Sequence, residues 1–89
     1  MTKAHLEKAE ILGPLMKLEA TRLAFAANER ALHLHLGAKL RGKRVECGVS
    51  VREMARRIGF SAAYVSDVET GRRNVTIAFA DAFMEALDR

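Results

Sequence analysis

Two adjacent arginines and a lone tyrosine are the side chains of this sequence best suited to binding chemistry. Arg72 and Arg73 directly follow Gly71, and Tyr64 precedes them in the same segment. Guanidinium groups bind phosphates through paired hydrogen bonds, and a tyrosine hydroxyl can reach a phosphate while its ring covers apolar surface. These residues predict a phosphate-binding surface. The alternative for Tyr64 is a partly buried packing residue, and for the arginines it is solvated charge without a ligand.

The sequence does not indicate catalytic or metal chemistry. No nucleophile accompanies a base, no glycine-rich loop is suited to cradle a phosphate, and no pair of acids lies in an apolar setting. His33 and His35 are two residues apart, so they face different sides of a helix, and no carboxylate or cysteine nearby completes a metal site. We therefore expect no enzyme activity, no metal and no cofactor, and a structural or surface role for both histidines.

The compartment expected for this chain is the cytoplasm. Cys47 is the single cysteine of the 89 residues, so an internal disulfide is excluded and a reducing environment fits. We expect Cys47 to be a small packing residue, with a redox-sensing thiol as the alternative. No run approaches the ~18 apolar residues of a membrane span, and no basic-then-apolar signal peptide opens the chain. The sequence therefore predicts neither a membrane segment nor export.

Positive charge is concentrated in one part of the chain. From Lys39 to Asn74 there are nine Lys or Arg residues and four acids, a local balance of +5. From Val75 to Arg89 the balance is −2, and over the first 36 residues it is +1. A nucleic-acid phosphate backbone attracts a basic surface of this kind. A solvated charged face is the alternative.

The elements that position this charge are two short helices around a tight turn. Ala55, Gly59 and Val65 have the spacing of helices that cross closely, with a small residue under the crossing and a left-handed glycine in the turn. The side chains expected to fill the core around them are Met54, Ile58, Phe60 and Val68. This spacing predicts a helix-turn-helix, whose second helix enters the DNA major groove.

Capping residues give the expected helix boundaries. Ser50 is expected to cap the first helix of the motif, with Glu53 completing a capping box. Ser61 caps the second helix, which ends near Thr70 before Gly71, and Thr76 caps the last helix. The chain has one proline and no alternating strand pattern. We therefore predict an all-α, compact helical domain.

A long helical segment is expected before the motif. The first helical stretch is interrupted at Gly13-Pro14, a helix follows over residues 15–36, and another runs from Gly37 to Cys47. The helix over 15–36 has two apolar stripes, which predicts burial on more than one side. We divide the chain into an N-terminal helical extension at 1–36 and a DNA-binding domain at 37–89.

The second of these segments resembles the XRE-type helix-turn-helix regulators, the group that contains phage Cro and repressor proteins. The matching text is L-G-A-K-L-R-G-K-R-V-E-C-G-V-S at 36–50, R-E-M-A-R-R-I-G-F-S at 52–61 and A-A-Y-V-S-D-V-E-T-G-R-R-N at 62–74. The resemblance covers roughly three fifths of the chain, and E-T-G-R-R is among its more specific parts. It implies a lambda-repressor-like fold and sequence-specific binding of double-stranded DNA.

Site residues follow from this resemblance position by position. It implies that the second helix of the motif reads base edges and that the loop after it grips phosphates. The expected base-reading residues are Ala62, Ala63, Ser66 and Asp67, and the expected phosphate-binding residues are Ser61, Tyr64, Arg72, Arg73 and Asn74. The resemblance also implies a buried ion pair between Arg44 and Glu69. Alternatives are that these two are independent surface charges, and that Asp67 pairs with an arginine of its own chain.

The chain departs from the family at three points. Val51 stands where the family often has a glutamine that binds a phosphate and braces the second helix of the motif, so that contact is expected to be absent. The fifth helix that often supports dimerisation is missing before Arg89, and residues 1–35 are an extra helical segment that the simplest members lack. We therefore expect the N-terminal extension to supply the dimer contact, through a stripe of Met16, Leu23 and Ala27. The resulting hypothesis is a homodimeric repressor of a phage or mobile-element promoter. The alternative is a protein-binding regulator, an antitoxin or antiactivator, on the same scaffold.

Overall fold

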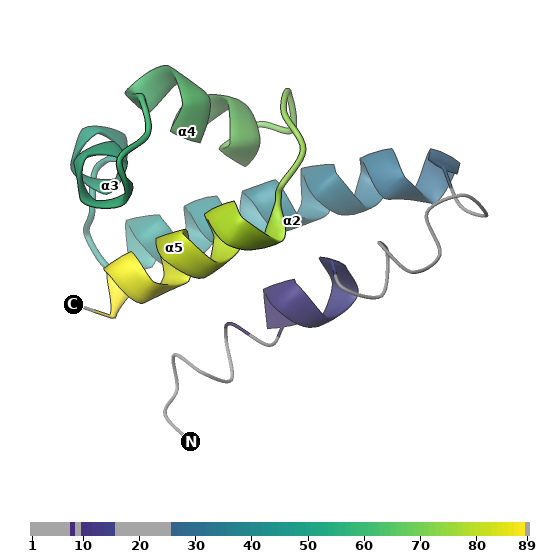
Figure 1. The fold of residues 1–89 in the computed structure, drawn as a ribbon, viewed down its shortest axis with the longest axis horizontal. Coiled ribbons are helices and arrows are strands. Elements are labelled where there is room, and N and C mark those ends of the chain that lie inside the picture. Colours follow the sequence, from purple (N-terminus) through teal and green to yellow (C-terminus); the bar gives the residue numbers. More distant parts are fainter. Residues whose placement is uncertain (1–7, 9, 16–25, 89) are drawn as a thin grey trace.

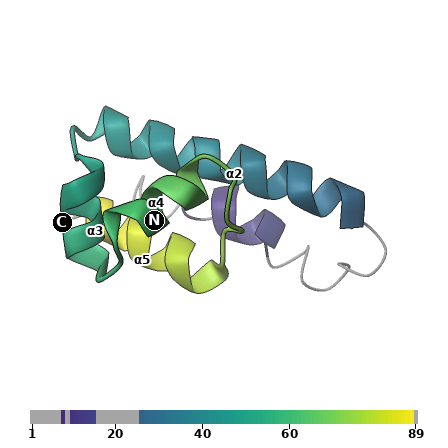
Figure 2. The same ribbon diagram turned by 90° about the horizontal axis from the view of Figure 1, so that it is seen from above.

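The structure, a computed structural model, describes residues 8, 10–15 and 26–88, and all regular elements in this part of the chain are helices. The bounded helices are α2 (Ala26–Glu46), α3 (Val51–Ile58), α4 (Ala62–Glu69) and α5 (Ile77–Leu87). Residues 10–15 are also helical. The long α2 extends along one side of the molecule, with α4 and α5 packed against it and α3 in contact with both (Figures 1 and 2). The predicted all-α fold is confirmed.

One apolar core joins these helices. Its largest fully buried side chains come from every bounded helix: Leu36 and Leu40, Met54, Val65 and Val68, and Phe79, Phe83 and Met84. Each fully buried side chain of this size stabilises the fold by roughly 1.5–3 kcal/mol relative to exposure. Phe60 is the exception among the predicted core residues, because it is 38% exposed. It lies in the connection between α3 and α4, so only part of its ring meets the core.

The predicted turn and capping residues are confirmed. Gly59 has a φ of 77° and its N–H donates to the carbonyl of Ala55, which ends α3. Ser50, Ser61 and Thr76 are the N-caps of α3, α4 and α5, and each side-chain oxygen accepts from a backbone N–H at 3.0 Å. These caps satisfy donors that a helix start leaves unpaired. Each of these three helices therefore begins directly after the capping residue that its sequence predicts.

The expected helix start at Gly37 is wrong, because α2 runs without interruption from Ala26 to Glu46. A Cβ atom at Gly37 would overlap the backbone carbonyl oxygen of Val68 in α4. Gly37 thus lies where α4 approaches α2 closely. Glycine marks a close helix crossing at this position, whereas its local sequence context resembles a helix boundary.

The described part of the N-terminal extension packs against α2 and α5 (Figure 1). Ile11 and Leu15 are buried in the core, at 0% and 2% exposure. Gly13-Pro14 was expected to kink or break the helix, and the break is wrong, since residues 10–15 are helical throughout. Proline removes one backbone donor, and the burial of apolar neighbours on both sides of it offsets that loss.

Two ion-pair groups fix this segment at its edges. Lys8 lies 2.9 Å from Asp81 and 3.1 Å from Glu85, both on α5. Glu10 lies 3.3 Å from Lys39 and 3.7 Å from Lys43, both on α2. Hydrogen bonding to Asp81 raises the pKa of Lys8, and hydrogen bonding to Lys39 lowers the pKa of Glu10. The segment therefore spans α2 and α5 and belongs to the same packed unit.

Among the helices described, none combines the length and the apolar character that crossing a bilayer requires.

Candidate nucleic-acid interface

The outer face of α4 carries the exposed side chains of this helix. Val65 and Val68 point into the core at 0% exposure, while Ala63 and Ser66 are exposed. Ala62, one of the predicted base-reading residues, is half-buried and packs against the core. The face that a ligand meets is therefore centred on Ala63 and Ser66, with Asp67 half-buried at its edge.

Asp67 forms no ion pair with any residue that the structure describes, so the alternative of an internal pair with an arginine is not observed. Its backbone carbonyl has a separate role. That oxygen accepts from the N–H groups of Arg72 and Arg73, at 2.9 Å and 3.2 Å. The carboxylate is left available to an external donor such as a base amino group.

Arg44 and Glu69 form a bidentate ion pair between α2 and the end of α4. Arg44 Nε donates to Glu69 Oε2 at 2.7 Å and Nη2 donates to Oε1 at 2.8 Å. Arg44 Nη1 also donates to the carbonyl of Val49 at 2.8 Å. Both residues are buried, at 8% and 5% exposure, and the hydrogen bonds to Glu69 raise the pKa of Arg44. The pair fixes the direction of α4 relative to α2.

The loop from Thr70 to Thr76 is held at several points along its backbone. Gly71 has a φ of 81°, and a Cβ there would overlap the side chain of Leu34. The N–H of Val75 donates to His33 Nδ1 at 3.0 Å, in a buried contact. Between these anchors, the side chains of Arg72, Arg73 and Asn74 are exposed. We refer to these three residues as the basic loop.

Tyr64 connects α4 to the basic loop. Its ring stacks on Phe60 with a centroid distance of 4.7 Å and lies 5.6 Å from the ring of Phe79. The Arg73 guanidinium carbon lies 4.5 Å from the centroid of the Tyr64 ring. The ring is half-buried, as expected if Tyr64 is a packing residue. It also contacts the guanidinium group of Arg73, a predicted phosphate-binding residue.

Most of the positive charge counted in the sequence is paired with acids. Lys39 and Lys43 pair with Glu10, and Arg44 pairs with Glu69. Arg56 and Arg57 both pair with Glu53, and these hydrogen bonds, that of Arg56 first, lower the pKa of Glu53 to about 2. The cations of this region without an acidic partner among the described residues are Arg41, Arg52, Arg72 and Arg73.

A comparison with protein families bears on this geometry. Residues 35–89, more than half of the chain, match a family described as a helix-turn-helix domain. The chain belongs to that family. Searches of curated proteins and of solved structures gave no match. In this helix-turn-helix domain α3 and α4 are the two helices of the motif, and Gly59 lies in its turn.

The remaining predicted site residues divide between the described and undescribed parts of the chain. Ser61 is exposed and its hydroxyl accepts from the Tyr64 N–H, so it acts as a cap in the free domain. Met16 and Leu23 lie outside the described residues, and the side chain of Ala27 is likewise not described, although its backbone is part of α2. His33, buried at 6%, binds the loop backbone.

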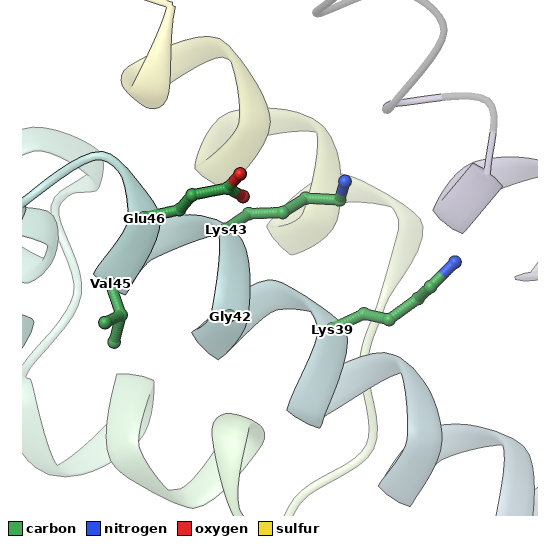
Figure 3. Close-up of a pocket in the computed structure, with 5 residues that line it drawn as sticks. All are labelled: Lys39, Gly42, Lys43, Val45 and Glu46. Carbon is green, nitrogen blue, oxygen red and sulfur yellow. The ribbon is translucent and has the colours of Figure 1, made fainter.

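A hollow on α2 is lined by Lys39, Gly42, Lys43, Val45 and Glu46 (Figure 3). The lysine side chains extend toward the helical segment at residues 10–15, and Val45 points away from them (Figure 3). Glu10 pairs with both lysines and Glu46 also lines the hollow, so two acids balance the two lysine charges and no net positive charge is left for an anion. The basic loop remains the better anion-binding surface.

Sequence reasoning did not identify the contacts through which α2 holds α4 and the loop, although a structural role was one of the two expected for His33. Gly37, His33 and Leu34 contact residues between 31 and 42 positions later in the chain: Val68, Val75 and Gly71 respectively. No local pattern marks such distant contacts. The apolar periodicity of α2 identified only its core face.

Proposed function

We propose that this helix-turn-helix domain is a sequence-specific, DNA-binding transcriptional regulator that has no catalytic activity and acts in the cytoplasm. The observation that carries the proposal is the pairing of an exposed α4 face with an adjacent basic loop. Arg72 and Arg73 have no acidic partner among the described residues and sit on a backbone fixed at both ends. Cations of this kind release counterions from DNA, whereas cations already paired with acids release fewer.

In this proposal α4 enters the major groove and the basic loop binds the backbone. Ala63 offers a methyl group that contacts thymine methyls, Ser66 hydrogen-bonds to base edges, and Asp67 accepts from the amino group of cytosine. Ala62 contributes at the margin because it is half-buried. Such a face makes few directional contacts, so DNA shape is expected to supply part of the specificity.

The first test is a salt-dependent gel shift on the DNA upstream of the gene that encodes this chain, followed by a footprint. The expected result is a protected site whose affinity falls steeply with salt, with weaker binding to unrelated duplex. Arg72→Ala and Arg73→Ala should weaken both kinds of binding by similar factors. An affinity for this DNA no greater than for unrelated duplex would contradict sequence-specific regulation at this site.

Base reading by α4 is tested by selecting preferred sites for an Ala63→Gln, Asp67→Ala variant. The glutamine adds a bidentate group for adenine and the alanine removes the acceptor for cytosine, so the preferred sequence should change. Selection of the wild-type site by this variant would show that another element reads the bases. Arg52→Ala, on α3, serves as the control that leaves α4 intact.

The finer proposal is a homodimeric repressor of a phage or mobile-element promoter, acting on a palindromic operator. One motif makes few contacts, and two motifs about a dyad read half-sites one helical turn apart. Leu23→Glu should give monomers by light scattering and weaken operator binding, whereas His35→Glu, at an exposed position of α2, should change neither. Monomeric wild type with an asymmetric footprint would contradict the dimer.

A protein-binding regulator, antitoxin-like or antiactivator-like, is the second candidate. Leu34 and Val45 of α2 are 54% and 60% exposed, which favours a protein partner over DNA at that face. This candidate predicts that Val45→Asp abolishes capture of a partner while DNA affinity stays unchanged. A protein with no DNA affinity at low salt would favour it over the first proposal.

A further inference from the structure

We propose that the ring of Tyr64 positions the Arg73 side chain for a DNA phosphate, and that Tyr64 acts through Arg73 and not through its own hydroxyl. The inference rests on the proposed function, because it names how one residue of the basic loop is prepared for DNA. Its basis is the 4.5 Å separation between the Arg73 guanidinium carbon and the Tyr64 ring centroid. At this distance an arginine is attracted to the electron-rich face of the ring.

The Tyr64 ring is itself held in place. Its backbone N–H donates to the Ser61 cap at 3.0 Å, so Tyr64 lies in the first turn of α4. The ring stacks on Phe60 at 4.7 Å and contacts Phe79, a core residue that is 1% exposed. Aromatic contacts at these distances add to the apolar burial. A cation above this ring therefore rests on a platform that continues into the core.

Arg72 provides a natural contrast within the same loop. Its backbone N–H donates to the carbonyl of Asp67, as does that of Arg73. However, the structure gives the Arg72 side chain no ring and no acid among the described residues. Two neighbouring arginines with a common backbone anchor thus differ in one respect, namely the aromatic support of the guanidinium group.

The support affects binding through the order of the side chain. An arginine loses rotamer freedom when it binds a phosphate, and this loss opposes binding. Arg73 has given up part of that freedom in the unbound protein, so less remains to be lost. The contact also leaves the guanidinium edges free to donate hydrogen bonds, because stacking uses only the face of the group.

The experiment is a double-mutant cycle on the full chain, with mixed-sequence duplex DNA as the probe because phosphate contacts do not depend on sequence. The variants are Tyr64→Phe, Tyr64→Leu, Arg72→Ala and Arg73→Ala, with the two alanine variants also combined with Tyr64→Leu. Tyr64→Leu should weaken binding roughly two- to fivefold, because the part of the Arg73 rotamer freedom that the ring removes in the free protein must then be lost on binding. Tyr64→Phe should bind as wild type does, because the phenyl ring keeps its face.

The cycle gives opposite expectations for the two arginines. In the Arg73→Ala background, Tyr64→Leu should have little further effect. In the Arg72→Ala background it should weaken binding by its full factor. If Tyr64→Phe binds as weakly as Tyr64→Leu, the hydroxyl is the DNA contact and the proposal is overturned. Equal effects of Tyr64→Leu in both backgrounds also overturn it.

A second measurement tests the contact between Tyr64 and Arg73 without the leucine substitution, so it does not depend on whether Tyr64→Leu alters the fold. In the free protein, NMR should show the Arg73 side-chain protons shifted upfield by the Tyr64 ring current, in wild type and in Tyr64→Phe. Unshifted Arg73 protons in wild type would overturn the proposal without reference to DNA. A wild-type protein that shifts them but binds no duplex would instead remove the proposed function.

Discussion

The contact between α2 and α4 and the basic loop that follows α4 use arginine in opposite ways. At the helix contact, Arg44 is 8% exposed and donates hydrogen bonds to Glu69 and to the Val49 carbonyl. In the loop, Arg72 and Arg73 are exposed and have no acidic partner among the described residues. The first region uses charge to fix two helices, and the second presents charge to the solvent.

This difference shows why a charge count does not locate a binding surface. The segment from Lys39 to Asn74 has nine cations, yet five of them pair with Glu10, Glu53 or Glu69. What remains is a smaller group that includes the two loop arginines. Stability should therefore depend on the paired cations and DNA affinity on the unpaired ones.

The largest expected effect is on the buried pair. Glu69→Ala leaves the Arg44 guanidinium buried without its counterion, which should destabilise the domain by about 3 kcal/mol and lower the Tm by roughly 15 °C. Arg72→Ala is the exposed control. The double variant Arg44→Met, Glu69→Leu should be more stable than either Glu69→Ala or Arg44→Ala. An unchanged Tm in both single alanine variants would contradict a structural pair.

Next in size is a pair of glycine substitutions in α2. Gly37→Ala places a methyl group against the Val68 carbonyl and should destabilise the domain by about 2 kcal/mol through overpacking. Gly42→Ala has no atom within 4 Å of the new methyl group and should stabilise the helix by about 0.5–1 kcal/mol. Denaturant unfolding measures both. Equal effects would mean that α4 does not approach α2 at Gly37.

A smaller effect on stability, with a clear effect on binding, is expected in the loop. Arg72→Ala should change the free energy of unfolding by no more than about 0.5 kcal/mol, as for most exposed positions. It should also flatten the slope of log affinity against log salt by about one unit. Glu69→Ala, assayed at a temperature where it is folded, should leave that slope unchanged. If Glu69→Ala flattened the salt dependence of DNA affinity and Arg72→Ala did not, the helix contact and not the loop would be the DNA-binding region.

The smallest effect concerns the exposed pairs of Glu53. Its carboxylate has a pKa of about 2, below the ordinary value of 4.5, because Arg56 and Arg57 donate to it. Because the pKa of Glu53 is lower in the folded state, its ion pairs stabilise the folded protein at pH values above the ordinary pKa. This stabilisation is lost as the pH falls from about 4.5 to about 2. The Tm difference between wild type and Glu53→Gln should therefore shrink over that range. A difference that stays constant over that range would contradict the ion pairs of Glu53.

Local signals in the sequence predicted the motif well. Ser50, Ser61 and Thr76 cap helices through oxygens that bond only three residues ahead, and Gly59 adopts its left-handed conformation within a single turn. Both features depend on neighbours that a short window contains. The capping box at Glu53 was half correct, since Ser50 accepts from its N–H but the carboxylate binds two arginines instead.

Contacts between distant segments explain what the sequence left open. Gly37 was interpreted as a helix start, whereas its actual constraint is the carbonyl of Val68, 31 residues away. Tyr64 was expected to use its hydroxyl, and its contact with Arg73 depends on the fold of the loop. These relations arise when α4 packs on α2, and no periodicity along the chain encodes them.

The outer face of α4 has one further consequence, for how such a protein diverges. Ala63 and Ser66 are exposed, and the Asp67 carboxylate has no ionic partner among the described residues. The residues between and beside them, Val65, Val68 and Glu69, are buried. Substitutions at the first three positions leave the core and the buried ion pair untouched. After gene duplication, this exposed face can therefore change one residue at a time while each intermediate stays folded.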